Sequence, residues 1–282
     1  MLFTDNIGEY LSLDETEMSN GELYTILTNK EAQGKKGAIV AMIEGVTSES
    51  VISILNKIPL SKRRKVKEVT VDMANNMNLI ISSCFTKAET VIDRFHVQKL
   101  AAEAVQDVRI KYRWDAIDKE NLEIEKSRKE NTRYKPIILS NGETVKQLLA
   151  RSRYLLFKPS TRWTDSQLQR SKILFKYYPK IEKAYNLSQK LTYIYENYTD
   201  KGKAMTKFAK WYKDVEESGF KAFNTVARSF YLHYDKILNY FNNRSTNASA
   251  ESFNAKIKRF RAEFRGVKDL EFFLFRLTKI FA

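Results

Sequence analysis

The sequence has little of several residue types, and each shortage excludes a class of protein. Its 282 residues include one cysteine, Cys84, which excludes an internal disulfide framework and a cysteine-based zinc site. The only histidines are His96 and His233, so a histidine-rich metal site is excluded as well. A bound metal would be held mainly by carboxylates, as Mg²⁺ or Mn²⁺ is. Nine glycines and four prolines are few for this length, which disfavours a loop-rich or all-β chain.

Long apolar runs are also missing. No run approaches the roughly 18 residues that a membrane-spanning helix needs. The first residues, MLFTDNIGEYLS, lack the basic and apolar regions of a signal peptide. We therefore expect a cytoplasmic protein with no membrane partner.

The residues that are abundant indicate a folded, basic protein. Hydrophobic residues make up 43% and charged residues 29% of the chain, which is far from the composition of disordered segments. Lys and Arg number 49 against 34 acidic residues, giving a net charge of +15. A charge of this size favours a polyanionic partner, above all nucleic acid.

The first 95 residues show short apolar segments separated by turn residues and amphipathic stretches. This pattern predicts seven elements: strands at 9–15, 22–29 and 37–45, a helix at 48–58, a strand at 66–73, a helix at 74–85 and a strand at 88–95. Three antiparallel strands followed by helix-connected parallel strands form a mixed sheet. This order is similar to that of ribonuclease-H-like folds, although the pattern by itself indicates only an α/β protein.

The middle of the chain differs in character. From about residue 97 to 243 the sequence reads as long helices with interleaved charged and aromatic residues, and segment 119–146 is its most polar part. We predict an all-α insertion at 98–243. It would divide a catalytic core into a first part, 1–97, and a second part, 244–282.

Two aspartates stand out on this outline. Asp14 lies at the end of the first predicted strand and Asp72 at the end of the fourth, and these strands are neighbours in a ribonuclease-H-like sheet. Two carboxylates that face each other repel unless a divalent cation lies between them. The alternative is that each aspartate begins a turn or caps a helix.

A third acidic residue lies on a basic helix near the end of the chain. Phe253, Ile257, Phe260 and Phe264 would form its apolar face. Glu251, Asn254 and Lys258 share a stripe nearly opposite that face. Residues 244–268 carry seven basic and two acidic side chains, a local charge of +5 that would attract a phosphate backbone. The alternative for Glu251 is a first-turn glutamate favoured by the helix dipole.

The segments LSLDET, VTVDMANNM, ETVIDRFHVQKL and STNASAESFNAKIKRFR occur in this order along nearly the whole chain. Together they resemble the catalytic region of bacterial insertion-sequence DDE transposases of the ISL-three type. The resemblance implies a ribonuclease-H-like core with a helical insertion and a catalytic, metal-binding triad of Asp14, Asp72 and Glu251. Lys258 matches the basic position that contacts DNA near the cleavage site in many DDE enzymes. On the same basic helix we expect Asn254, Arg259, Arg261 and Arg265 to bind DNA as well.

A further element, Asp93 to His96, resembles the aspartate-x-x-histidine motif found after the second catalytic aspartate in several related families. Asp93 could fix the tautomer and orientation of His96 beside the metal or the DNA. A purely structural hydrogen bond at a strand end is the alternative. A competing assignment makes Asp93 the second catalytic aspartate, but we favour Asp72 because its strand is predicted to lie next to the first.

The resemblance implies a DNA transposase that uses two Mg²⁺ or Mn²⁺ ions for strand cleavage and strand transfer. Alternatives are a ribonuclease-H-like nuclease or resolvase and a non-catalytic DNA-binding protein derived from a transposase. We expect a homo-oligomer on DNA, associated with the nucleoid when bound. Only 13 residues precede Asp14, whereas relatives usually carry a zinc finger and a helix-turn-helix there. We therefore expect the chain to be either a fragment or one that works with a separate DNA-recognition protein.

Overall fold

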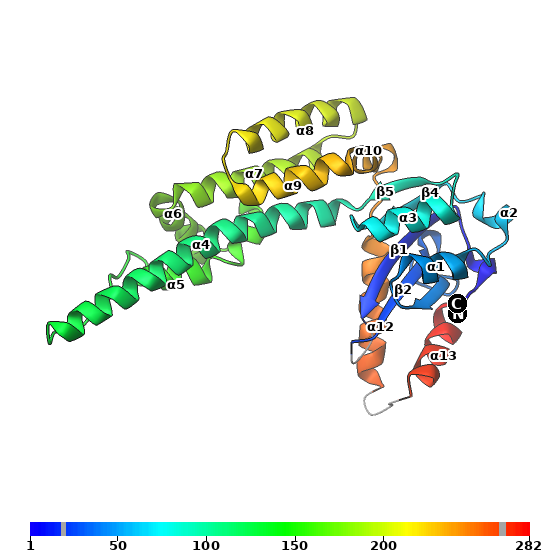
Figure 1. Cartoon of the computed structure of the whole chain (residues 1–282), viewed down its shortest axis with the longest axis horizontal. Helices are drawn as coiled ribbons and strands as arrows, with labels where there is room; N and C mark the ends of the chain where they lie inside the picture. Colours follow the sequence, from blue (N-terminus) through cyan, green and yellow to red (C-terminus); the bar gives the residue numbers. More distant parts are fainter. Residues whose placement is uncertain (18–20, 265–268) are drawn as a thin grey trace. The chain divides into compact units, whose positions relative to one another are not determined.

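The computed structural model describes residues 1–17, 21–264 and 269–282. The described chain forms two compact units. The first combines residues 1–96 with residues 233–282 and contains the sheet, and the second consists of residues 97–232 and is helical (Figure 1).

The first unit is built on a five-stranded mixed sheet. Its strands, in the spatial order β3-β2-β1-β4-β5, are β3 (Ile39–Glu44), β2 (Leu23–Asn29), β1 (Tyr10–Glu17), β4 (Glu68–Val71) and β5 (Glu89–Ile92). β1, β2 and β3 pair antiparallel, while β4 pairs parallel with both β1 and β5. The predicted mixed sheet, with the fourth strand beside the first, is confirmed.

Helices connect and cover these strands. Those of the first unit are α1 (Ser48–Leu55), α2 (Leu60–Arg63), α3 (Asn75–Cys84), α10 (Tyr234–Leu238), α11 (Tyr240–Asn243), α12 (Ala248–Glu263) and α13 (Leu270–Phe281), with short 3₁₀ helices at Thr4–Asn6 and Lys30–Ala32. The strand predicted at 88–95 is wrong at its end, because β5 stops at Ile92. The Asp93 side chain accepts a hydrogen bond from the Phe95 backbone N–H at 3.3 Å, as residues at helix starts do, and a helix begins at Arg94.

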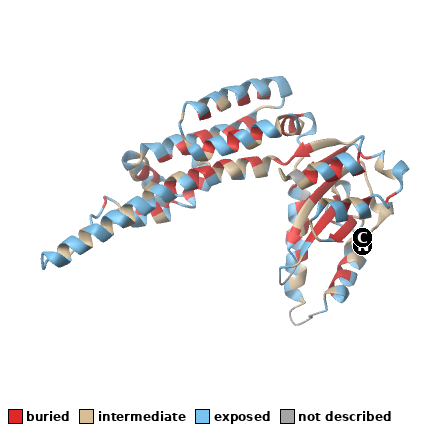
Figure 2. Cartoon of the chain, viewed as in Figure 1, coloured by how far each residue is buried: buried red, intermediate tan, exposed pale blue. Residues whose placement is uncertain are grey.

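The core of the first unit lies on both faces of the sheet, where Figure 2 shows the strands coloured as buried. On one side, Phe253 and Ile257 of α12 and Phe273 and Leu277 of α13 pack with apolar side chains of β2 and β3. Phe260 is partly buried against the same cluster. The apolar face predicted for α12 is therefore confirmed for Phe253, Ile257 and Phe260. Their packing fixes the helix that carries Glu251 against the sheet.

The helical unit contains six α-helices within its described residues. They are α4 (Arg94–Lys129, whose first turn belongs to the first unit), α5 (Val145–Arg151), α6 (Asp165–Tyr177), α7 (Pro179–Asn197), α8 (Lys201–Glu216) and α9 (Lys221–Leu232), with 3₁₀ turns at Leu155–Phe157 and Ser160–Arg162. Capping boxes begin α5 at Thr144 and α6 at Thr164. The buried rings of Phe208, Trp211 and Phe230 pack together in its core.

Within the part of the chain that the structure describes, no helix is both long enough and apolar enough to cross a membrane.

Candidate active site

Three aspartates lie at the same level of neighbouring strands, Asp14 within β1 and Asp72 and Asp93 directly after β4 and β5. The prediction that Asp14 ends its strand is wrong, because β1 continues to Glu17. Ser12 of β1 pairs with Thr70 of β4, so continuing this parallel register by two residues brings Asp14 level with Asp72. Val71 of β4 pairs with Ile92 of β5, so the next residues, Asp72 and Asp93, are also level. Side chains level with each other in neighbouring strands point to the same face of a sheet. The sheet therefore presents three carboxylates in a row.

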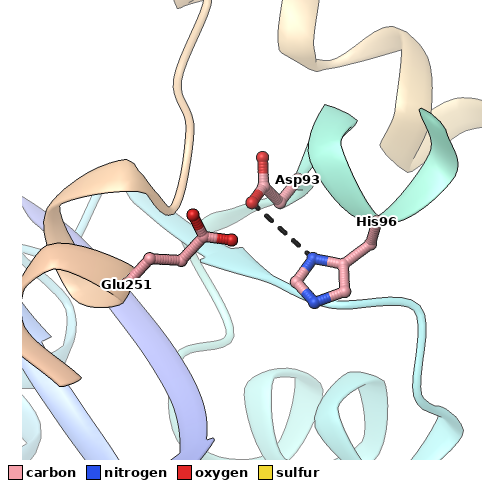
Figure 3. A group of neighbouring side chains, drawn as sticks. All are labelled: Asp93, His96 and Glu251. Carbon is pink, nitrogen blue, oxygen red and sulfur yellow. Dashed lines mark ion pairs between the residues drawn. The ribbon is translucent and has the colours of Figure 1, made fainter. Parts of the chain in front are cut away.

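Glu251 of α12 reaches the β5 end of this row. Atoms of the Asp93, His96 and Glu251 side chains that could bind a metal all lie within 4.8 Å of one another (Figure 3). Asp93 is fully buried, His96 is partly buried and Glu251 is exposed. This group combines a residue that follows β5, one in the first turn of α4 and one in the first turn of α12. It is open to solvent on the Glu251 side.

The carboxylates affect one another's protonation. Burial raises the pKa of Asp14 from an ordinary 3.8 to about 6, and the charges of Asp72 and Glu251 act in the same direction. The hydrogen bond from the Glu15 backbone N–H and the charge of His96 oppose this rise. Because like charges gather here, a cation would lower the electrostatic energy of the site.

His96 lies beside Asp93. Its Nδ1 lies 3.6 Å from Asp93 Oδ2, and interaction with Asp93 raises the pKa of His96 despite burial, with smaller contributions from Asp72 and Asp14. Figure 3 shows the imidazole with Nδ1 toward Asp93 and Nε2 on the opposite side of the ring. Asp93 thus sets which ring nitrogen remains available to other groups.

A series of side-chain amides attaches the segment before α12 to the sheet. Each bonds one strand or its end, moving from β5 to β4 and then to β1. The bonds run from Asn239 Nδ2 to Thr90 O (3.0 Å), from Asn242 Nδ2 to Glu89 Oε1 (2.8 Å), from Asn243 Nδ2 to Glu68 Oε2 (3.2 Å) and from Ser12 Oγ to Asn247 Oδ1. We call these four residues, Asn239, Asn242, Asn243 and Asn247, the asparagine series. It leads the chain across the sheet to the position where α12 begins.

Asn243 of the asparagine series bonds Glu68, which is part of a buried ion pair with Lys30. Glu68 is 1% exposed, and Lys30 Nζ lies 2.9 Å from its Oε1. Burial alone would raise the pKa of Glu68, but Lys30 and hydrogen bonds from Ser245 and Asn243 lower the pKa below its ordinary value. Glu68 is therefore a buried anion whose charge and hydrogen bonds are satisfied, which makes it a firm anchor.

The other residues predicted for the site lie along α12. Asn254 donates from Nδ2 to Asp14 Oδ2 at 2.7 Å, so α12 bonds the first aspartate directly. Lys258 is exposed, Arg259 pairs with Glu263 at 3.3 Å, and the Arg261 guanidinium lies 4.9 Å from the centre of the Phe273 ring. Arg265 lies outside the described residues.

Sequence reasoning did not find Asn243, Asn247 or Glu68. Asn247 is 0% exposed, yet its Nδ2 has no hydrogen-bond partner within the described residues. The only signal for these residues was the density of asparagines in YFNNRSTNAS just before a helix, which turns and helix caps also explain.

Two comparisons with known proteins show which family the chain belongs to. A family model described as transposase, of the ISL-three type, matches residues 11–277. The transposase for insertion sequence element IS1001 of Bordetella parapertussis is 23% identical over 274 residues, covering 97% of this chain. The match covers 61% of that relative, so this chain spans about three fifths of its length. The family match over nearly the whole chain leads to one conclusion: the chain belongs to the DDE transposases of the ISL-three type.

Proposed function

We propose that this chain is the catalytic region of an insertion-sequence transposase with a ribonuclease-H-like fold, and that it cleaves DNA and transfers strands in a divalent-metal-dependent reaction. One observation carries the proposal. Continuing the strand register places Asp14 of β1 level with Asp72 and Asp93, which directly follow the adjacent strands β4 and β5, and Glu251 of α12 lies next to Asp93. The net charge of +15 supports a nucleic acid as substrate.

The side chains suit a pair of Mg²⁺ or Mn²⁺ ions. Burial raises the pKa of Asp14, and the charges of Asp72 and Glu251 raise it further, so carboxylates that repel each other gather at this site. Oxygen ligands of this kind match hard divalent cations. We assign Asp14, Asp72 and Glu251 as the residues that hold them. When bound, such ions supply Lewis acidity to the attacking and leaving oxygens of a phosphoryl transfer.

The remaining side chains position the groups that react. Asp93 orients His96, and interaction with Asp93 favours the protonated imidazole, which can contact a phosphate oxygen through Nε2. Asn254 fixes the Asp14 carboxylate through its 2.7 Å hydrogen bond. Lys258, exposed on the same stripe of α12, would contact the phosphate backbone, assisted by Arg259, Arg261 and Arg265. We further propose a homo-oligomer on the DNA and recognition of the element ends by a separate protein or region.

Glu251→Gln tests the proposed function. The change removes one carboxylate charge at nearly constant volume, so metal-dependent cleavage should be abolished while salt-sensitive DNA binding persists. Glu263→Gln is the matched control, because Glu263 is an exposed carboxylate on the same helix and, among the described residues, forms an ion pair only with Arg259. Cleavage by Glu251→Gln at the rate of the control would reject the assignment.

The reaction class is tested with a substrate that already carries a free 3′ end. A transposase joins this end to target DNA, whereas a nuclease or resolvase stops after hydrolysis. Strand transfer in the presence of Mg²⁺ supports the proposal, and hydrolysis alone identifies the nuclease alternative. DNA binding with neither activity identifies the non-catalytic alternative.

The choice between Asp72 and Asp93 as the second metal ligand needs a separate test. We expect Asp72→Asn to abolish cleavage at all Mg²⁺ concentrations, and Asp93→Asn to retain activity with an altered pH profile because His96 loses its partner. The reverse pattern would identify Asp93 as the ligand.

A further inference from the structure

The helical unit contains a buried arginine whose charge is not neutralised. Arg109 of α4 is 3% exposed. Its Nε donates to Gln106 Oε1 at 2.7 Å and its Nη1 donates to Leu149 O at 2.8 Å. Both acceptors are uncharged oxygens, so they satisfy hydrogen bonds and leave the positive charge in place. A buried charge is costly unless it is paired.

Glu143, another buried charged residue in the same unit, does form ion pairs. Glu143 is 4% exposed and accepts hydrogen bonds from Arg170 at 2.7 Å and from Arg151 at 3.1 Å. The helical unit therefore pairs this buried anion with two cations. Within the described residues Arg109 has no corresponding ion pair, although α5, which supplies Leu149 O, also carries Arg151.

Two exposed arginines lie close to Arg109. Arg113 follows one turn later on the same face of α4. Arg153 follows α5, and its backbone carbonyl accepts a 3.1 Å hydrogen bond from Gln106, the residue that also accepts from Arg109. Burial lowers the pKa of Arg109, and the charges of Arg113 and Arg153 lower the pKa further. We call Arg109, Arg113 and Arg153 the arginine cluster. In the described part of the chain none of them forms an ion pair.

Large aromatic side chains accompany the exposed arginines. Tyr154 is 67% exposed, and the guanidinium of Arg153 lies 5.6 Å from the centre of its ring. Trp114, which follows Arg113 in the sequence of α4, is 60% exposed. Guanidinium groups bind phosphate oxygens, while exposed rings offer faces on which bases stack. A free phosphate ion would use only the arginines, so this combination favours a nucleic acid.

We propose that the arginine cluster is a phosphate-binding site of the helical unit, in which Arg113 and Arg153 contact the backbone of the DNA substrate above the buried Arg109. The inference rests on the proposed function, because it takes DNA as the substrate. It adds a second contact region to the basic helix α12. It also gives the buried Arg109 its counter-charge in the DNA complex.

The test uses the full chain carrying Arg113→Ala and Arg153→Ala together. Both side chains are exposed, so the variant should fold, and fluorescence of the three tryptophans, all within residues 97–232, reports the state of this unit. The control carries Lys203→Ala and Lys210→Ala, which removes the same charge from exposed positions on α8. Affinity for a mixed-sequence DNA duplex is measured without metal over about 50 to 200 mM salt.

Losing two phosphate contacts should weaken binding about tenfold and reduce the slope of log affinity against log salt by about 2, whereas the control should change the slope by much less. Equal slopes for the two double variants would overturn the proposal while leaving the proposed function intact. A wild-type chain that does not bind DNA would instead reject the proposed function.

A second experiment uses inorganic phosphate to test whether the arginine cluster binds a free anion. If it raises the unfolding midpoint of the wild-type helical unit but not that of Arg113→Ala with Arg153→Ala, while both proteins show the same salt slope for DNA, the site takes a free anion. The assignment to DNA would then be wrong. No stabilisation by phosphate, together with the expected loss of DNA affinity, would support the DNA backbone as the ligand.

Discussion

The repulsion and burial of the carboxylates of Asp14, Asp72 and Asp93 lower the stability of the folded protein, and a substitution of Asp14 can measure part of this effect. Its pKa rises from 3.8 to about 6 on folding, so the folded protein binds this proton more tightly than the unfolded chain does. The stability that this group contributes is full below pH 3.8 and is lost as the pH rises through about 6. A difference of about two pH units corresponds to a loss of at most about 3 kcal/mol at pH 8.

Asp14→Asn removes this charge and should stabilise the metal-free protein. The gain is smaller than 3 kcal/mol, because the Asp14 carboxylate accepts hydrogen bonds from Asn254 and from the Glu15 backbone, and one amide oxygen replaces two carboxylate oxygens. One lost hydrogen bond costs about 1 kcal/mol, which leaves a net gain of about 2 kcal/mol at pH 8. At pH 5 the wild-type carboxyl is largely protonated when folded, and the gain should fall below about 1 kcal/mol.

The assay must follow the unit that contains Asp14. All three tryptophans lie in the helical unit, so their fluorescence does not report on the sheet. Cys84 does, because it is the only cysteine, lies on α3 and is 1% exposed. Burial raises the pKa of its thiol to about 11, which further protects it in the folded state.

We would therefore measure urea unfolding in EDTA from the labelling of Cys84 with a pyridyl disulfide, which reacts with thiols at acidic as well as alkaline pH. Mg²⁺ at pH 8 should stabilise the wild type and have a much smaller effect on Asp14→Asn. A variant that is no more stable than the wild type at pH 8, or whose advantage does not shrink at pH 5, would refute the reasoning.

Two further predictions concern the placement of α12. Phe253→Ala should destabilise the sheet-containing unit by about 3 to 5 kcal/mol in the same Cys84 assay, because Phe253 is 1% exposed within the cluster that holds α12. Phe272→Ala, on α13 at 46% exposure, should change stability by no more than about 0.5 kcal/mol, and equal losses would contradict this account of the packing. Asn247→Ala should raise the Mg²⁺ concentration for half-maximal cleavage about tenfold, since Asn247 joins the start of α12 to β1. Asn242 is exposed and bonds β5, so Asn242→Ala should raise this Mg²⁺ concentration less than Asn247→Ala does. A larger rise for Asn242→Ala would show that Asn247 does not position Glu251.

The sheet was predictable because its information is local. Alternating or continuous apolar residues marked all five strands, and each of the two parallel strands β4 and β5 is followed directly by an aspartate. The level placement of Asp14, Asp72 and Asp93 depends on the parallel register, which side-chain alternation alone does not determine. The similarity of the predicted strand order to a ribonuclease-H-like sheet indicated that the first and fourth strands are neighbours before the register was known.

Contacts between distant segments could not be predicted in the same way. Helical periodicity placed Asn254 on the stripe of Glu251, but its bond to Asp14 joins residues 240 positions apart. The bond from Ser12 to Asn247 spans 235 positions. Arg109 gave no signal at all, because its hydrogen bond to the carbonyl oxygen of Leu149 in α5 joins residues 40 positions apart. Pairings of this kind depend on tertiary packing, and a single sequence does not encode them in any local pattern.

The positions at which the chain leaves and re-enters the first unit explain why the large helical unit inserted before Glu251 does not determine the position of Glu251. The chain leaves after Asp93 and His96, directly beyond β5, and returns at His233. α10 packs on β5, and Asn239 then bonds Thr90 of the same strand. The two ends of the insertion are thus fixed to one strand, and the entropy cost of closing a chain segment grows only slowly with its length. The asparagine series then carries the chain over β4 to β1 within a few residues. The position of α12 is therefore determined by contacts inside the first unit, and the length of the helical unit can vary without displacing Glu251 from the aspartate row.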